Sequence, residues 1–326
     1  MILSYPSYYK EFSCIASSCP DSCCHLWQVD VDEEAAAYYR SLPGPLGDRL
    51  RQVLTEDNTM TLENRRCPMW RDDGLCRIQA ELGHEALCHT CREFPRLTHD
   101  YGNFTERMLE LSCPEAARLI FTMEDRTVTE ELPGDFADDY DEELMEILLK
   151  SRDTVMDFLK TTQLPLNRAL TVVLLYAHTV QGAIDGGEDY TFDPEECLTL
   201  GQRFADVGDL SPVIAYFKDL ELLTDRWAEL LSNAQQQPVG DRLKPLAIYM
   251  IRRYWLQAVS DYDLISRVKL TVTACILVSA LEGDPVQTAQ LFSKEIENDY
   301  DNLEALLDGA YTSPAFTDAN LLGLLR

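Results

Sequence analysis

The sequence predicts a mainly α-helical protein in which an irregular, cysteine-rich metal-binding domain is followed by an α-helical bundle or array. Nine of the eleven cysteines fall within the first 113 of the 326 residues. After residue 138, apolar residues recur at helical spacing, and strand-like alternation is nearly absent. We therefore expect a metal domain over residues 1–125 and a helical domain over residues 138–326, joined by a linker at residues 126–137.

The predicted metal domain contains only short regular elements. VDVDEEAAAYYRSL predicts a helix capped by Asp32, and PLGDRLRQVL predicts a second, amphipathic helix. RIQAELG predicts a short helix that closes at Gly83. Asp73–Gly74 marks a turn, Tyr101–Gly102 marks a hairpin, and Pro114 marks the first turn of another helix. A domain so poor in long periodic segments needs another source of stability, which metal ligation can supply.

The sequence after residue 138 predicts a succession of α-helices. Leu144, Ile147 and Leu148 begin an apolar stripe at helical spacing. Further helices are predicted at residues 165–182, 194–207, 212–233, 241–259, 262–281 and 285–297. YMIRRYW, at residues 249–255, is interpreted as core packing from which two arginines extend their charged ends toward solvent.

A net charge of −28 limits the classes of partner. Such a field repels a phosphate backbone, so we expect no nucleic-acid binding, whereas a lysine-bearing polypeptide would be attracted. No run of 18 apolar residues predicts a membrane span, and MILSYPSYYKEF lacks the basic and apolar regions of a secretory signal. We expect a cytoplasmic protein without a membrane partner.

The cysteines carry the strongest chemical signal. They occur in CIASSCPDSCCHLW, CPMWRDDGLC, CHTC and LSCPEAARL, which place Cys14, Cys19, Cys23, Cys24, Cys67, Cys76, Cys88, Cys91 and Cys113 in one third of the chain. In a reducing compartment, clustered thiols favour metal ligation over disulfides. Iron–sulfur clusters and zinc both take thiolate ligands, and nine thiols exceed the four that one structural zinc needs. One 4Fe–4S cluster with spare thiols and two separate centres both remain open.

Other chemistry finds little support. A redox dithiol of Cys88 and Cys91 would need a βαβ setting, which the flanking sequence does not predict. Cys197 and Cys275 lie in apolar helical runs and are expected to be buried as small hydrophobic residues. The sequence has no glycine-rich phosphate loop, no GxSxG, no HExxH and no GxGxxG. No catalytic residue is therefore assigned.

Three segments together resemble a known family. FSCIASSCPDSCCHLWQVDVD, CPMWRDDGLCRIQAELGHEALCHTCREFPR and LELSCPEAARL are similar to the flagellin lysine N-methylase family, whose defining region is a cysteine-rich domain of the CxxCxxCC type. The resemblance is most specific over residues 11–121. It implies transfer of methyl groups from S-adenosylmethionine to lysine side chains of flagellin, with an iron–sulfur cluster in the cysteine domain.

Carried over to this chain, the resemblance implies metal ligation by Cys19, Cys23, Cys24, Cys67, Cys76, Cys88 and Cys91, with Cys14 and Cys113 matching the longer methylase version. Trp27, Arg92, Pro95 and Arg96 fall on other marked positions. Arg92 and Arg96 could offset the charge of the thiolates and hold a carboxylate of the cofactor or substrate. The competing interpretation of the two arginines is ion pairing with acidic neighbours.

Two further functional classes stay open at this point. The cysteine motif also suits a non-catalytic zinc- or iron-binding interaction module, or a redox sensor that loses its cluster to oxidants. A methylase needs an aromatic pocket for the lysine amine. The aromatic candidates for it are Tyr38, Tyr39, Trp70, Tyr249, Tyr254 and Trp255.

Overall fold

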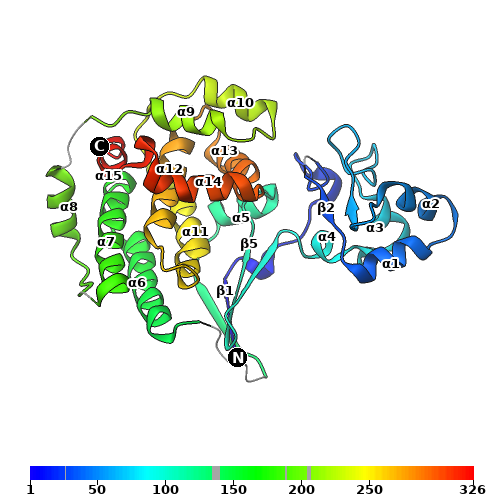
Figure 1. Ribbon diagram of the computed structural model, residues 1–326, viewed down its shortest axis with the longest axis horizontal. Helices are drawn as coiled ribbons and strands as arrows, with labels where there is room; N and C mark the ends of the chain where they lie inside the picture. Colours follow the sequence, from blue (N-terminus) through cyan, green and yellow to red (C-terminus); the bar gives the residue numbers. More distant parts are fainter. Residues whose placement is uncertain (26, 134–139, 188, 204–206) are drawn as a thin grey trace.

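The computed structural model describes the whole chain except residues 26, 134–139, 188 and 204–206. Fifteen α-helices and six short strands occur within the described residues, which confirms the mainly α-helical class. We call residues 13–95 the cysteine lobe and residues 140–326 the helical body. The cysteine lobe extends from one end of the helical body (Figure 1). In the described part of the chain, no helix is both long and apolar enough to cross a membrane.

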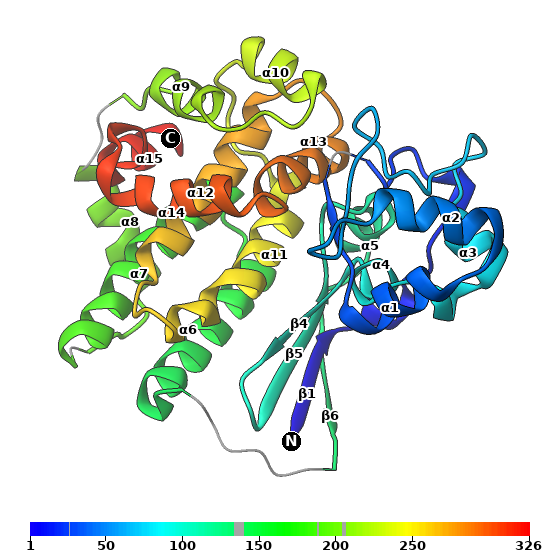
Figure 2. The ribbon, with the colours of Figure 1, turned by 45° about the vertical axis from the view of Figure 1, so that its right-hand side comes forward.

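A four-stranded sheet connects these two parts. Its order is β4-β5-β1-β6, made by β4 (Arg96–Asp100), β5 (Phe104–Leu109), β1 (Ile2–Pro6) and β6 (Thr127–Glu131). β1 pairs parallel with β5 and antiparallel with β6. The four strands lie side by side, and one end of the sheet lies at the N-terminus, as Figure 2 shows. The chain therefore leaves this sheet after β1, forms the cysteine lobe, and returns to the sheet at β4.

Two sequence expectations meet this sheet. The predicted hairpin at Tyr101–Gly102 is confirmed, with Gly102 at a φ of +82°. The predicted linker is wrong for residues 127–131, because they form β6, in which Val128 and Glu130 are less exposed than their neighbours. Residues 134–137 of that linker lie outside the described residues. β6 has only five residues, so its alternation of inward and outward side chains is too short to predict a strand next to charged residues.

The cysteine lobe is built from short elements. They are β2 (Val29–Asp30), α1 (Glu33–Ser41), α2 (Gly44–Val53), β3 (Thr59–Met60), α3 (Arg77–Leu82) and α4 (His89–Glu93). The predicted cap is confirmed, since one carboxylate oxygen of Asp32 accepts from the backbone N–H of Ala35 at 3.0 Å. The other oxygen accepts from the N–H of His89 at 2.7 Å. Asp32 thus ties the start of α1 to the start of α4.

The helical body contains most of the regular structure. Its helices, with α5 from the preceding segment, are α5 (Pro114–Thr122), α6 (Glu142–Thr161), α7 (Leu166–Gly186), α8 (Pro194–Arg203), α9 (Ser211–Asp219), α10 (Asp225–Ser232), α11 (Lys244–Tyr254), α12 (Ile265–Ala280), α13 (Pro285–Phe292), α14 (Tyr300–Thr312) and α15 (Asp318–Leu324). The one helix predicted at residues 212–233 is two, because Asn302 and Glu295 hold the loop between α9 and α10. α13 continues into a π-helical turn, Ser293–Glu297.

Buried side chains form two separate groups. The smaller lies wholly in the cysteine lobe and includes Tyr39, Leu50, Met69 and Cys88. The larger combines sheet residues and α5 with the helical body. Contact between buried side chains does not by itself divide the chain into domains. The predicted domains of residues 1–125 and 138–326 therefore stay a prediction.

The arginines of YMIRRYW do not extend toward solvent as expected. Arg252 and Arg253 are 5% and 9% exposed. Arg252 forms a bidentate ion pair with Asp125, and the Nε of Arg253 lies 3.2 Å from a carboxylate oxygen of Glu297. Each guanidinium has a carboxylate within the core, so neither needs water to balance its charge.

Candidate metal centre

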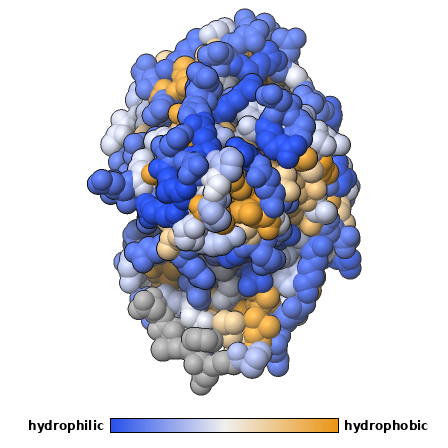
Figure 3. Space-filling view, turned by 90° about the vertical axis from the view of Figure 1, so that its right-hand side faces the viewer, coloured by the Kyte–Doolittle hydropathy of each residue, from blue (hydrophilic) through white to orange (hydrophobic). Residues whose placement is uncertain are grey.

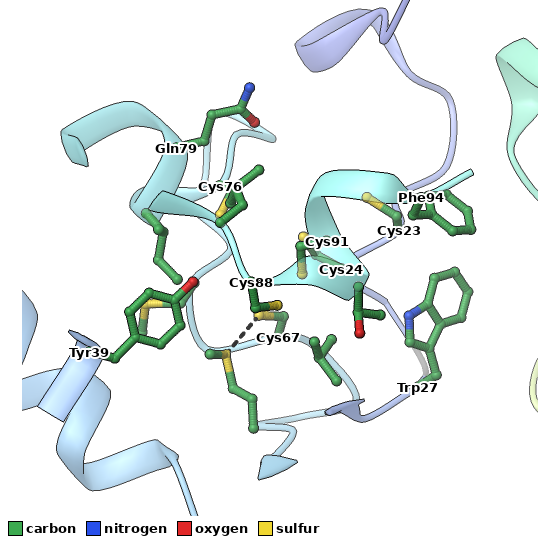
Figure 4. A pocket seen from close by; sticks show the side chains of 16 residues that line it. Cys23, Cys24, Trp27, Tyr39, Cys67, Cys76, Gln79, Cys88, Cys91 and Phe94 are labelled. Atoms are coloured by element: carbon green, nitrogen blue, oxygen red, sulfur yellow. Dashed lines mark hydrogen bonds between the residues drawn. The ribbon is translucent and has the colours of Figure 1, made fainter. Parts of the chain in front are cut away.

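Six cysteines from four segments of the cysteine lobe line one cavity. They are Cys23, Cys24, Cys67, Cys76, Cys88 and Cys91. Figure 4 shows Cys24, Cys67, Cys88 and Cys91 close together, with Cys76 and Cys23 on opposite sides of them. The remaining wall is largely apolar and aromatic and includes Trp27, Tyr39 and Phe94. The structure thus brings together thiols that are up to 68 positions apart in the sequence.

Local structure explains this convergence. Cys76 and Cys88 stand immediately before α3 and α4, and Cys91 is the third residue of α4. The backbone N–H of Cys67 donates to the carbonyl of Cys24 at 2.8 Å. Tyr39 of α1 donates its hydroxyl to the carbonyl of Ala86 at 2.7 Å, which fixes the approach to α4. The segments of Cys24, Cys67 and Cys88 are therefore held by contacts that do not involve their own thiols.

The thiols interact with one another inside the cavity. A hydrogen bond from Cys91 lowers the pKa of Cys88 to about 7, against the effect of burial. The same bond raises the pKa of Cys91, and burial raises it further. A hydrogen bond from Cys24 likewise lowers the pKa of Cys67, against burial. The arrangement thus favours a thiolate at Cys88 and at Cys67, and the thiolate is the form that binds metals.

The donor set suits a thiolate-ligated metal centre. Among the described residues that line the cavity, there are six cysteines and no carboxylate or imidazole. Iron–sulfur clusters and structural zinc take such ligands, whereas hard ions such as calcium and magnesium take oxygen. Within the described residues, no three Cys, His, Asp or Glu side chains already form a group that could hold an ion. All eleven cysteines are free thiols.

The other three predicted ligands do not line this cavity. Cys14 is exposed, and its sulfur accepts from the N–H of Ala16 at 3.4 Å. Cys19 is half-buried, and Cys113 is buried at the start of α5. Burial, with smaller contributions from the neighbouring Cys19 and Cys23, raises the pKa of Cys113 to about 12. Cys113 therefore lies near the first cysteine segment, on the side of the helical body.

The remaining predicted site residues fall in different places. Trp27 lines the cavity and contacts Phe94, with ring centroids 5.8 Å apart. Arg92 lies within 3.7 Å of Glu93, and the guanidinium of Arg96 lies 5.1 Å from the ring centroid of Phe12. Neither arginine is among the described residues of the cavity wall. A role for Arg92 and Arg96 in cofactor binding stays a prediction.

Of the six aromatic candidates, Tyr39 alone is among the described lining residues. Burial raises its pKa, followed by the effects of Cys88 and Cys91. Tyr249, Tyr254 and Trp255 are instead buried in the larger core. A tyrosine that stays protonated and donates to a backbone carbonyl is suited to shaping the cavity rather than to accepting a proton.

Lys294, which comes from the helical body, also lies beside the cavity and has no motif in the sequence that points to it. Its ammonium lies 2.7 Å from both carboxylate oxygens of Asp21 and 5.3 Å from the ring centroid of Trp27. The charge of Lys294 also opposes the factors that raise the pKa of Cys23, which are a hydrogen bond with Cys24 and burial. One lysine in an apolar helical pattern carries no sequence signal, so only the fold could reveal this contact.

The end of the molecule that carries the cysteine lobe is mainly hydrophilic at its surface. Figure 3 shows this face, with hydrophobic surface gathered near its middle and at its lower edge. Exposed apolar residues of the lobe include Tyr38 and Leu82, at 43% and 36% exposure.

Comparison with known proteins gives partial matches. The chain is 33% identical over 129 residues to the flagellar biosynthetic protein FliU of Salmonella muenchen, and the match covers 35% of this chain and 74% of FliU. It is 32% identical over 129 residues to the Lysine-N-methylases of Salmonella typhimurium and Salmonella choleraesuis. In both of these the match covers 35% of this chain but only 31% of the relative. No family model and no solved structure matches the chain.

Proposed function

Because the chain belongs to the family of FliU and the Lysine-N-methylases, we propose that it is a protein-lysine N-methyltransferase that acts on flagellin. S-adenosylmethionine supplies the methyl group in this proposal. The lysine ammonium first loses a proton to solvent, and its nitrogen then forms a bond to the methyl carbon. The carbon–sulfur bond of the sulfonium breaks with its electron pair going to sulfur, so that S-adenosylhomocysteine leaves. The observation that carries the proposal is the 32% identity to two Lysine-N-methylases.

We propose that the six-cysteine cavity holds an iron–sulfur cluster. The donor chemistry supports this, since the described lining residues offer thiols without carboxylates. Such a cluster would supply redox-active iron to the protein. The chain's own residues shape the surroundings, as Trp27, Phe94 and Tyr39 line the cavity with aromatic surface. That wall would exclude water from the metal and from a bound substrate.

The charge of the chain supports a basic protein segment as substrate. At a net charge of −28, long-range attraction favours the approach of lysine-bearing surfaces. This attraction weakens with ionic strength, since exposed charges are screened over about 8 Å at physiological salt. A flagellin segment presenting lysines fits this requirement.

The decisive experiment combines metal analysis with methyl transfer. Protein purified without oxygen is analysed for iron, sulfide and zinc, and is then incubated with flagellin and isotopically labelled S-adenosylmethionine. We expect iron and sulfide in equal amounts, and label on flagellin lysines by mass spectrometry. Cys88→Ser serves as the inactive variant and Cys197→Ser as the matched control, because Cys197 lies in the larger core. Full iron content without transfer to any lysine would count against the enzyme.

A second candidate is a non-catalytic metal-binding module. The match covers 74% of FliU but only 31% of each Lysine-N-methylase, so the chain lacks an aligned counterpart for most of those two proteins. A module would bind zinc or iron and a flagellar protein without binding S-adenosylmethionine. Calorimetric titration with S-adenosylmethionine distinguishes the two candidates.

A further inference from the structure

Two side chains of the helical body hold the first cysteine segment. Lys294, only 2% exposed, places its ammonium 2.7 Å from both carboxylate oxygens of Asp21. Gln290, on α13, donates from its amide nitrogen to Asp21 at 3.2 Å and to the backbone carbonyl of Ser112 at 2.6 Å. Figure 2 shows α13 at the side of the helical body that faces the cysteine lobe.

Both targets lie next to predicted metal ligands. Asp21 is two residues from Cys19 and two from Cys23, and Ser112 directly precedes Cys113. The ammonium of Lys294 also lies over the ring of Trp27, which lines the cavity. Through these contacts, α13 and the turn after it lie directly against the segment that carries the first cysteines.

That segment has little other support. Between Phe12 and Val29, no described residue is fully buried, whereas the segments that carry Cys67 and Cys88 contribute to the core of the lobe. The backbone bond from Cys67 to Cys24 holds its far end. A chain segment without buried apolar side chains gains little from packing, so directed polar contacts have to fix its position.

The turn that carries Lys294 is itself firmly anchored. In the π-helical turn Ser293–Glu297, Glu295 accepts from the N–H of Leu223 at 2.7 Å. Glu297 accepts from the hydroxyl of Tyr254 at 2.8 Å and pairs with Arg253. All five residues of this turn are buried. A single turn of π-helix often occurs at functional sites, because it redirects neighbouring side chains. Here the neighbouring side chains of Lys294 and Glu295 contact different parts of the molecule.

We propose that Lys294 and Gln290 are positioning residues that clamp the Cys19–Cys24 turn against the cavity. The helical body thereby completes the metal centre, although the cavity-lining thiols come from the cysteine lobe. The part of this inference that concerns metal rests on the proposed function. The clamp itself is a property of the protein without metal.

The test measures the clamp with and without metal. Hydrogen–deuterium exchange of the metal-free protein reports the mobility of residues 14–24, and iron, sulfide and visible absorption report the loaded centre. Lys294→Met removes the ammonium. Asp21→Asn keeps Lys294 but removes the negative charge that it pairs with, and Lys294→Arg keeps the ion pair. Lys160→Met is the matched control, because Lys160, on α6, also forms an ion pair, in this case with Asp125 at 3.2 Å, but makes it away from the cysteine lobe.

We expect Lys294→Met and Asp21→Asn to speed amide exchange in residues 14–24 by about tenfold or more, while residues 67–91 are unchanged. Bound iron falls to about half or less, with an altered absorption spectrum. Lys294→Arg and Lys160→Met behave like the unmodified chain. The exchange of Asp21→Asn decides the matter if Lys294→Met fails to fold, since the side chain of Asp21 is 27% exposed and its change is milder.

Unchanged exchange of residues 14–24 in Asp21→Asn and Lys294→Met overturns the clamp, whatever the metal content. If the unmodified chain binds neither iron nor zinc, the proposed metal centre fails, and amide exchange still decides the clamp. The two proposals therefore fail by different measurements.

Discussion

The backbone N–H of Cys67 donates to the backbone carbonyl of Cys24 at 2.8 Å, which joins two cysteine motifs that are 43 positions apart. This bond places both residues in the wall of one cavity. Because it uses backbone atoms, it survives replacement of either thiol. Substitutions at Cys24 and Cys67 can therefore separate ligation from folding.

Cys67→Ser and Cys24→Ser should each lower bound iron by about tenfold, because a hydroxyl is a far poorer ligand than a thiolate for iron. The measurement is iron and sulfide content after anaerobic purification. Cys197→Ser, in the larger core, should keep the content of the unmodified chain. Full iron and sulfide in Cys67→Ser would remove this residue from the ligand set.

Arg253→Met should lower the free energy of unfolding by about 3–5 kcal/mol, because the buried Glu297 then loses its cationic partner. Burial alone would lower the pKa of Arg253, but Glu297 and the buried Tyr249 and Tyr254 raise it well above its usual value. Denaturant unfolding gives the change. Lys150→Met, which breaks an exposed pair with Glu146, should cost under about 0.5 kcal/mol. A loss below about 1 kcal/mol in Arg253→Met contradicts the prediction.

Glu295 should make stability fall as pH rises. Burial raises the pKa of this carboxyl from 4.5 to about 7, although bonds from Thr224 and Leu223 act against the shift. Its Oε1 atom is buried without a hydrogen-bond partner. Between these two pH values the folded chain keeps a proton that the unfolded chain releases, so the free energy of unfolding decreases with pH. The penalty is fully present above pH 7 and is on the order of 3 kcal/mol.

Glu295→Gln should remove this fall, so that the variant gains stability relative to the unmodified chain between about pH 5 and pH 8. Chemical unfolding at a series of pH values measures the difference. The exposed Glu304→Gln is the control and should follow the unmodified chain. Parallel pH profiles for Glu295→Gln and the unmodified chain would show that the carboxyl is ionised throughout.

Gly47→Ala should destabilise the cysteine lobe by about 1–3 kcal/mol, because an added Cβ would lie 1.9 Å from the carbonyl oxygen of Leu42. Amide exchange of α1, α2 and α3 should increase, while the helical body stays protected. Gly186→Ala is the control, since its Cβ would meet no atom within 4 Å. Equal exchange in both variants would mean that the backbone of the lobe adapts without cost.

Local patterns predicted the local structure well. The Asp32 cap, the helices α1, α2 and α3 and the hairpin at Gly102 all follow from residues within a few positions of one another. Most helices of the body were likewise evident from apolar spacing. The failures came where distant residues decide, as in the loop between α9 and α10, which Asn302 and Glu295 hold.

The grouping of cysteines along the chain was evident from the sequence, but their arrangement in space was not. The motifs identified the thiols, whereas the fold separates six that share a cavity from Cys14, Cys19 and Cys113. The parallel pairing of β1 with β5 joins residues about a hundred positions apart and has no local signature. The same holds for Lys294 and Asp21, which are 273 positions apart.

The strand order has a consequence for biosynthesis. β1 emerges from the ribosome before its neighbours β5 and β6, which follow only after the entire cysteine lobe has been made. The lobe can therefore collapse before β1 has its neighbouring strands. The ends of the lobe become fixed side by side only when residues 104–131 arrive. Until α13 and Lys294 have also been translated, more than 150 residues after β6, the Cys19–Cys24 turn lacks its contact with the helical body.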